Sequence, residues 1–350
     1  MYIVIAILIF GVLIAVHELG HFLAAKSCGV RVNEFSIGMG PAILKRQGRE
    51  TLYSLRILPI GGYCAIEGED GSGDDERSMA KKPLICRLVI LFAGAFMNFL
   101  LGLLIVLIIV STGKAYSTTQ ISGFMDGFPL EGESGLMVGD KIVNIDGHSV
   151  NLLNEFSFFM DRGNGETVDI TVIRDGEKVV LNDLPLRLRD YEENGETVRR
   201  YGLYFDVEER SVLSALKNGW YNSMYFVKLV WIGLADLVTG RAKVSEMSGA
   251  VGAVAAISKV GAESGSVAAG LLNVFYLGAF IAVNLAVMNL LPIPGLDGGH
   301  IFTMIVSAVI ERIIGRKPNP KVESGIHAAG LILLLALMVI LTVSDVIKLF

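Results

Sequence analysis

Charged residues and cysteines are scarce in this chain of 350 residues. Only 19% of the residues are Asp, Glu, Lys or Arg, while 52% are hydrophobic and the mean hydropathy is +0.57. Because soluble domains average about 25% charged residues, this composition excludes a disordered chain and argues against an ordinary water-soluble enzyme. The three cysteines (Cys28, Cys64 and Cys86) are too few, and odd in number, for a disulfide framework.

The net charge of −5 conceals an acidic block. Residues 117–210 contain 19 Asp and Glu against 9 Lys and Arg, whereas Lys and Arg prevail in the rest of the chain. An acidic block within a basic, apolar remainder indicates two compartments and argues against a nucleic-acid partner.

Four apolar segments are long enough to cross a bilayer, which takes about 20 residues. We expect transmembrane helices over residues 1–26, 85–112, 267–313 and 326–348. The first segment lacks a basic leader and a small-residue cleavage site, so it is expected to be a retained helix rather than a signal peptide. Basic residues are concentrated in the loops after the first and third segments, which places these loops in the cytoplasm and both termini outside.

Residues 27–84 are expected to form a membrane-associated β loop on the cytoplasmic side. The run Tyr53–Ile60 mixes alternating and continuous apolar residues, and Gly61-Gly62-Tyr63 ends it. Residues 115–188 are expected to form a compact extracytoplasmic α+β domain, in which Asp175-Gly176 makes a hairpin turn.

Residues 210–262 are expected to contain an amphipathic helix followed by a connector. The helical pattern over Ser211–Val238 favours a helix at the membrane surface over a fifth span, because Lys228 and Asp236 interrupt its apolar face. The Gly- and Ser-rich residues that follow predict a re-entrant or loosely packed connector. The predicted fold class is therefore a multi-span α-helical membrane protein with four transmembrane helices, a β element and an external domain.

The sequence His17-Glu18-Leu19-Gly20-His21 lies inside the first apolar segment. Residues i and i+4 share one face of a helix, so both imidazoles can bind the same metal ion. Glu18 can take a proton from a water molecule that the ion activates, as this water attacks a carbonyl group. The alternative, a buried pair of histidines with a glutamate partner, is disfavoured because each ionisable group in hydrocarbon costs about 2.5–3.5 kcal/mol.

A catalytic zinc ion usually takes three protein ligands and keeps one position open. Asp297 is the candidate third ligand, because it is the only acidic residue in residues 267–310 and follows two prolines that break the third span. His300 is the alternative ligand. His148 is expected to be a surface turn residue, and His327 an interfacial side chain.

These motifs resemble the site-2 protease family of intramembrane zinc metalloproteases, and in particular its RseP type, the regulator-of-sigma-E proteases. The resemblance covers nearly the whole chain, through His17–His21, Pro59–Tyr63, Phe92–Leu100 with Asn98, a PDZ-like core in Gly135–Gly147, and Asn289–Gly298. The chain departs from the family in having Ala250 after Ser248-Gly249, where proline is usual, and a single PDZ-like unit where several relatives have two.

The resemblance implies Zn²⁺ at His17, His21 and Asp297, with Glu18 as the catalytic base. It implies cleavage of single-span membrane proteins within or near the bilayer of the bacterial inner membrane. Anti-sigma factors and remnant signal peptides are typical substrates, and an upstream site-1-type protease is a candidate partner. The PDZ-like unit would act mainly as a size filter.

Two sets of residues are candidates for substrate binding. A transmembrane helix must be unwound before cleavage, and the strand edge around Gly61, Gly62 and Tyr63 can hold an extended segment by strand addition. Asn284 and Asn289 lie beside the break before Asp297, and the family suggests that their amides bond the freed substrate backbone. The alternative is that both asparagines only hold helices together.

Two other functions compete with proteolysis. The first is a catalytically silent receptor or chaperone that binds partners through its PDZ-like domain, but such a protein has no reason to keep Glu18. The second is an ion or solute carrier, which the absence of a detectable inverted repeat disfavours.

Overall fold

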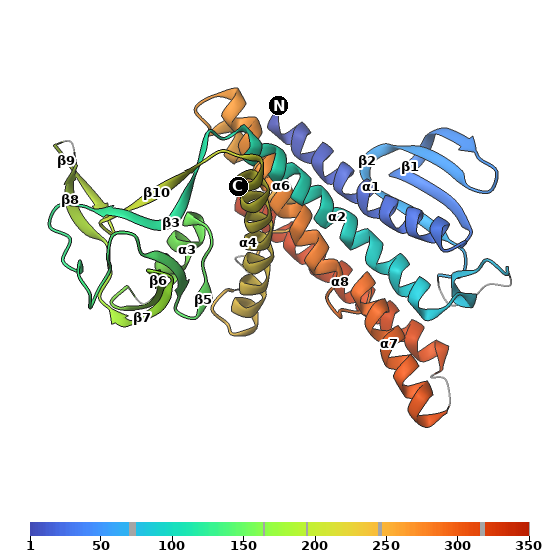
Figure 1. Cartoon of the computed structure of the whole chain (residues 1–350). Helices are drawn as coiled ribbons and strands as arrows, with labels where there is room; N and C mark the ends of the chain where they lie inside the picture. Colours follow the sequence, from blue (N-terminus) through green and yellow to red (C-terminus); the bar gives the residue numbers. More distant parts are fainter. Residues whose placement is uncertain (70–74, 164, 194, 244–246, 316–318, 350) are drawn as a thin grey trace. The chain divides into compact units, whose positions relative to one another are not determined.

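The computed structural model describes residues 1–69, 75–163, 165–193, 195–243, 247–315 and 319–349 (Figure 1). The helices are α1 (Tyr2–Ser27), α2 (Leu84–Thr112), α3 (Leu153–Arg162), α4 (Val212–Val238), α5 (Ala250–Ala262), α6 (Val267–Asn289), α7 (Asp297–Ile314), α8 (Pro320–Leu349) and the 3-10 turn Met79–Lys81. The strands are β1 (Val32–Gln47), β2 (Leu52–Ile66), β3 (Ala115–Phe124), β4 (Lys141–Ile145), β5 (His148–Ser149), β6 (Val168–Arg174), β7 (Glu177–Leu184), β8 (Arg189–Glu193), β9 (Glu196–Arg200) and β10 (Leu203–Glu209).

The chain forms two compact units. The first comprises Met1–Val106 and Phe226–Phe350, and the second comprises Leu107–Tyr225. The first unit contains the helix with the His-Glu-Leu-Gly-His sequence, the β1–β2 hairpin and the helices α5 to α8.

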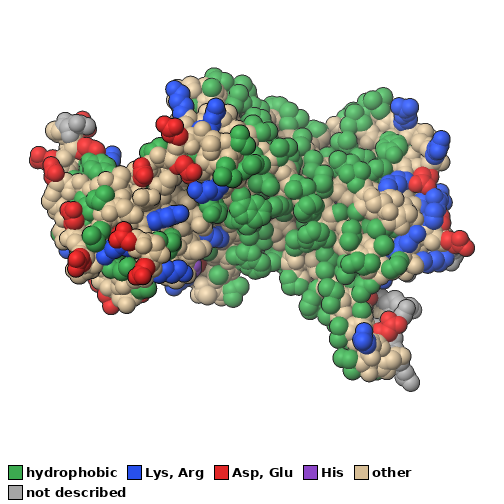
Figure 2. All heavy atoms as spheres, viewed as in Figure 1, with side chains coloured by type: hydrophobic (Ala, Val, Ile, Leu, Met, Phe, Trp, Pro, Cys, Tyr) green, Lys and Arg blue, Asp and Glu red, His purple; other side chains and the backbone are tan. Residues whose placement is uncertain are grey.

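Four helices are long and apolar enough to cross a membrane, as predicted: α1, α2, α6 and α8. Figure 2 shows hydrophobic side chains spread over the helices, and charged side chains gathered over the β1–β2 hairpin and on the second unit. The third predicted span is divided, because α6 ends at Asn289 and α7 begins at Asp297. Pro292 and Pro294 lie in this break, where proline cannot donate the backbone hydrogen bonds that a continuous helix needs.

The β1–β2 hairpin is folded back on itself. The first half of β1 lies between the two halves of β2, so Phe35 pairs with Tyr53 on one side and with Cys64 on the other. The segment 62–66 pairs with β1, and no other strand among the described residues pairs with it. This segment is therefore an edge strand, and the outward backbone groups of such an edge can pair with an added strand wherever the protein does not already bond them.

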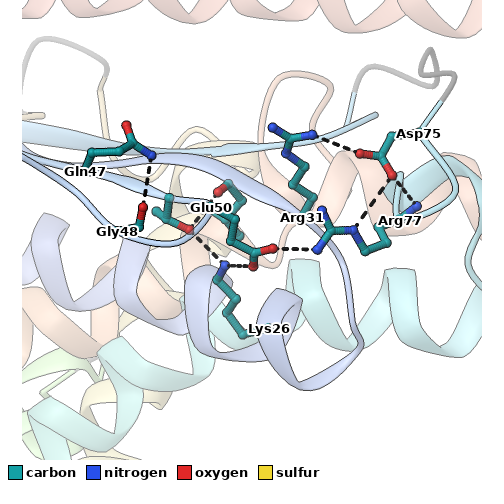
Figure 3. A network of polar contacts seen from close by, with 9 residues as sticks. Lys26, Arg31, Gln47, Gly48, Glu50, Asp75 and Arg77 are labelled. Atoms are coloured by element: carbon teal, nitrogen blue, oxygen red, sulfur yellow. Dashed lines mark hydrogen bonds and ion pairs between the residues drawn. The ribbon is translucent and has the colours of Figure 1, made fainter.

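A network of ion pairs fastens the hairpin to the end of α1 (Figure 3). Lys26, in the last turn of α1, donates hydrogen bonds to Glu50 and Thr51, which lie between β1 and β2. Glu50 also accepts a hydrogen bond from Arg77, whose backbone N–H bonds to Asp75. The network therefore joins the helix that carries Glu18 to the hairpin and to the chain that follows it.

The second unit contains a sheet in the order β10-β3-β4-β6-β7, with β5 paired to β4. The buried side chains of Ile142, Ile170 and Val172 form part of its core. Asp175 and Gly176 both have positive φ angles (51° and 85°) between β6 and β7, which confirms the predicted turn. Because β10 pairs with β3, this sheet continues to Glu209, beyond the predicted domain boundary at residue 188.

The connector predicted after α4 is not loosely packed, because residues 250–262 form the helix α5, and its re-entrant alternative stays a prediction. Alanine favours a helix, and glycine lets neighbouring helices approach closely. A Cβ atom at Gly261 would lie 2.6 Å from the ring of Tyr2 in α1. The buried Asp345 of α8 accepts hydrogen bonds from the backbone N–H groups of Gly249 and Gly252, which caps the start of α5. Residues 244–246 of the connector lie outside the described residues.

Candidate metal centre

Helix α1 brings the two histidines of the motif together. His17 and His21 lie one turn apart on the same face, and their Nε2 atoms are 3.1 Å apart. Both side chains are largely buried, with 13% and 9% of their surface exposed. The sequence prediction that one ion can reach both imidazoles agrees with this geometry.

Asp297, the first residue of α7, lies against both imidazoles. Its Oδ2 is 3.2 Å from Nε2 of His17 and 3.4 Å from Nε2 of His21. The chain places the carboxylate by a tight turn, since a Cβ atom at Gly298 or Gly299 would collide with the backbone of residues 290–293. Because residues 298 and 299 are glycines, the first turn of α7 can pack directly against the backbone between α6 and α7.

The three ligand atoms have the spacing that a tetrahedral ion requires. With bonds of about 2.0–2.1 Å, a tetrahedral zinc ion separates two ligand atoms by about 3.3 Å, and the three distances found here are 3.1, 3.2 and 3.4 Å. Oδ2 of Asp297 is also buried and has no hydrogen bond of acceptable geometry. A buried carboxylate oxygen without a hydrogen-bond partner needs an explanation, and a cation between the three groups supplies one.

Contacts behind the ligands orient both imidazoles. Nδ1 of His21 lies 2.8 Å from the carbonyl oxygen of Ile90 in α2, so His21 presents Nε2 toward Asp297. Nδ1 of His17 lies 3.4 Å from the side-chain amide of Asn289. Such outer contacts select the tautomer of a metal-binding histidine. The sequence does not predict the role of Ile90, because the contact uses its backbone carbonyl group, which every residue type has.

Gly94 of α2 is a second feature that sequence reasoning missed. A Cβ atom at this position would lie 2.7 Å from Cε1 of His17 and would collide with Nε2 of His21. Only glycine lets α2 pass this close to the two imidazoles. The available signal was a small residue inside an apolar span, a pattern that marks close helix packing.

Glu18 lies beside the edge strand of the hairpin. Its carboxylate accepts a hydrogen bond from the backbone N–H of Cys64. A Cβ atom at Gly62 would lie 3.7 Å from Cγ of Glu18, and the backbone oxygen of Ser36 would be only 2.7 Å away. The predicted catalytic base and the predicted substrate-binding edge therefore meet in the folded chain.

The side chain of Tyr63 is occupied within the hairpin. Arg56 donates hydrogen bonds to the Tyr63 hydroxyl and to Oε1 of Glu34, at 2.7 and 2.8 Å. Burial would raise the pKa of Glu34, but hydrogen bonds from Tyr63, Ser54 and Arg56, together with the charge of Arg56, lower this pKa to about 2. The Tyr63 hydroxyl is thus already hydrogen-bonded within the hairpin.

His300 lies outside the cluster of ligand atoms, which consists of His17, His21 and Asp297 among the described residues. Its ring stacks on that of His327, with centroids 3.7 Å apart. His327 is 9% exposed, because its ring packs on His300 and its Nε2 lies 3.0 Å from Oγ1 of Thr303, and its expected interfacial placement stays a prediction. His148 is exposed next to the β4–β5 turn, as expected.

Comparison with known proteins identifies the family of the chain. The sequence profile of peptidase family M50 matches residues 5–337. The chain belongs to this family, the site-2 proteases. A protein of Clostridium perfringens named "Putative zinc metalloprotease CPE1693" is 35% identical, and a protein of the same description from Clostridium acetobutylicum is 36% identical, each over 99% of this chain and at least 97% of its own length. The regulator of sigma-W protease RasP of Bacillus subtilis is 27% identical over 98% of both chains.

Family membership and the geometry of the three ligands together identify the chain as a zinc metalloendopeptidase. The four apolar helices place this M50 peptidase in a membrane, which it crosses several times.

Proposed function

We propose that this M50 peptidase cleaves single-span membrane proteins within or near the cytoplasmic membrane, with anti-sigma factors and remnant signal peptides as candidate substrates. The observation that carries the proposal is the meeting of His17, Glu18 and His21 on the apolar helix α1 with Asp297 at the start of α7, beside a strand edge that no other described strand pairs with. The printed name of RasP, a regulator of a sigma factor, supports substrates of the anti-sigma class.

Each residue of the centre then has a defined task. His17, His21 and Asp297 would hold the ion, and bound Zn²⁺ makes a water molecule nucleophilic and polarises the scissile carbonyl. Glu18 accepts the proton of the attacking water and passes it to the leaving amine. The N–H of Cys64 keeps the Glu18 carboxylate at the strand edge, where the peptide bond must arrive.

The substrate would bind in an extended form. A helical segment shields its peptide bonds in its own hydrogen bonds, and pairing with the edge at Gly61, Gly62 and Tyr63 replaces those bonds. Asn284, half-buried on α6, and Asn289, at its end, are proposed to bond the backbone that unwinding frees.

The remaining parts of the proposal concern topology and selection. The acidic second unit, with its PDZ-like segment, would lie outside together with both termini, and the basic loops 27–84 and 300–325 in the cytoplasm. Residues 316–318 of the latter loop lie outside the described residues. The PDZ-like segment would exclude substrates with bulky external domains, so an upstream site-1-type protease would act first on such substrates.

The test uses the purified full chain in liposomes with a single-span model substrate. We expect Glu18→Gln to keep its zinc and to lower the cleavage rate about 10²–10⁴-fold, the usual contribution of a general base. The matched control is Glu263→Gln, an exposed residue at the end of α5, which should cleave at the wild-type rate. Equal cleavage by wild type and Glu18→Gln would remove Glu18 from its assigned role. A wild-type protein that binds the substrate without cutting it would favour the silent-receptor alternative.

A further inference from the structure

The two histidine ligands are oriented by groups of different kinds. An imidazole that binds a cation through Nε2 is neutral, so its Nδ1 carries a proton and needs an acceptor. For His21 this acceptor is the carbonyl oxygen of Ile90, at 2.8 Å. For His17 the atom at Nδ1 is the side-chain nitrogen Nδ2 of Asn289, at 3.4 Å.

The orientation of the amide follows from the proton on His17. The oxygen and nitrogen of an asparagine amide are nearly identical in shape, and hydrogen bonding decides which one faces a neighbour. A protonated Nδ1 and the NH₂ group of Asn289 are both donors, so a metal-bound His17 requires the amide to turn over and place Oδ1, in place of Nδ2, at Nδ1. The NH₂ group then points away from the imidazole and stays available as a donor.

We propose that Asn289 is a positioning residue for His17. Its amide oxygen accepts a hydrogen bond from Nδ1–H, and this bond keeps Nε2 directed toward the ion. This role rests on the proposed zinc centre. It also deepens the substrate role of Asn289, because the amide oxygen would bond to His17 while the NH₂ group donates to the substrate backbone. Asn289 is also the last residue of α6, directly before the break that leads to Asp297. One short stretch of chain thus supplies both the third ligand and the support for the first ligand.

The test measures metal affinity in the absence of substrate. Zinc is titrated into the detergent-solubilised full chain in competition with a chromophoric chelator. Asn289→Leu, which keeps the branching at Cγ but removes the acceptor, should weaken zinc binding about 10–100-fold, as loss of an outer acceptor typically does. Asn289→Asp, which keeps an acceptor, should bind zinc within a few-fold of wild type. The visible spectrum of Co²⁺ bound in place of zinc should change in Asn289→Leu and not in Asn289→Asp.

The control is Asn284→Leu, the same substitution on the same helix. Five residues turn a helix by about 140° beyond a full revolution, so Asn284 lies on a different face from Asn289. This variant should keep wild-type zinc affinity. The proposal is overturned if Asn289→Leu binds zinc as tightly as wild type, or if Asn284→Leu weakens binding equally. A wild-type protein that fails to bind zinc would instead overturn the proposed function.

Discussion

The positions of two side chains, Asp297 and His300, distinguish the two candidates for the third metal ligand. Asp297 and His300 are three residues apart and both follow the break in the third span. The carboxylate lies 3.2 and 3.4 Å from the two Nε2 atoms, whereas the ring of His300 is stacked on His327. The geometry therefore favours Asp297 over His300 as the proposed third ligand.

We predict that Asp297→Ala removes zinc from the purified protein, because only two protein ligands remain. His300→Ala should keep its zinc, since the ring of His300 packs on another helix. Metal analysis of both variants, together with their thermal unfolding in detergent, checks this expectation. If His300→Ala lost the metal while Asp297→Ala retained it, the two assignments would have to be exchanged.

Gly94 leads to a second prediction at this scale. Gly94→Ala inserts a methyl group between α2 and the two imidazoles, and such overpacking costs about 1–3 kcal/mol. We expect weaker zinc binding in addition to lower stability. Gly102→Ala is the matched control, because its Cβ would lie 2.8 Å from Val283, on α6 and away from the imidazoles. This control should lower stability without changing zinc affinity. Unchanged zinc affinity in Gly94→Ala would show that the imidazoles tolerate the displacement.

At the scale of elements, the β1–β2 hairpin depends on a polar network that hydropathy cannot show. Glu34, Arg56 and Tyr63 come from three neighbouring segments of the hairpin and bond to one another. Arg56 also lies over the ring of Tyr63, with 5.3 Å to its centroid. The network keeps the edge strand in register beside Glu18.

This network predicts a pH dependence of stability. The pKa of Glu34 is about 2 in the folded chain, against 4.5 for the free group. A carboxyl group with a lowered pKa contributes stability above its unfolded value, and this contribution is lost as the pH falls through the folded value. Wild type should therefore lose stability relative to Glu34→Gln between pH 4.5 and 2. Unfolding midpoints of both proteins across this range measure the difference, and parallel curves would contradict the prediction.

At the scale of the whole molecule, charge sets the expected orientation. The acidic residues of the second unit and the basic residues around the hairpin occupy separate parts of the chain. Short basic loops stay in the cytoplasm during membrane insertion. The proposed topology places Glu196, on β9, outside and Lys45, on β1, inside.

Cysteine labelling in intact cells tests this orientation. Both positions are exposed, so Glu196→Cys should react with a membrane-impermeant maleimide, and Lys45→Cys should react only after the membrane is opened. The native Cys64 is buried and should be protected in both conditions. Labelling of Lys45→Cys alone in intact cells would invert the topology.

The sequence alone determined the four spans, the paired histidines and the candidate carboxylate. Length and apolarity define a spanning helix, and a spacing of four residues defines a helix face, so both are local properties. The family resemblance rested on the same local motifs. The turn at Asp175-Gly176 was predictable for the same reason, because two adjacent residues determine it.

Tertiary structure decided which groups surround those residues. The acceptor for His21 is a backbone carbonyl, the space for both imidazoles comes from Gly94, and the amide at His17 comes from a residue 272 positions away. Helix α5 forms where composition favoured a loose connector, since close packing and the carboxylate of Asp345 stabilise it. These contacts join residues that are far apart in the sequence, so patterns among neighbouring residues cannot predict them.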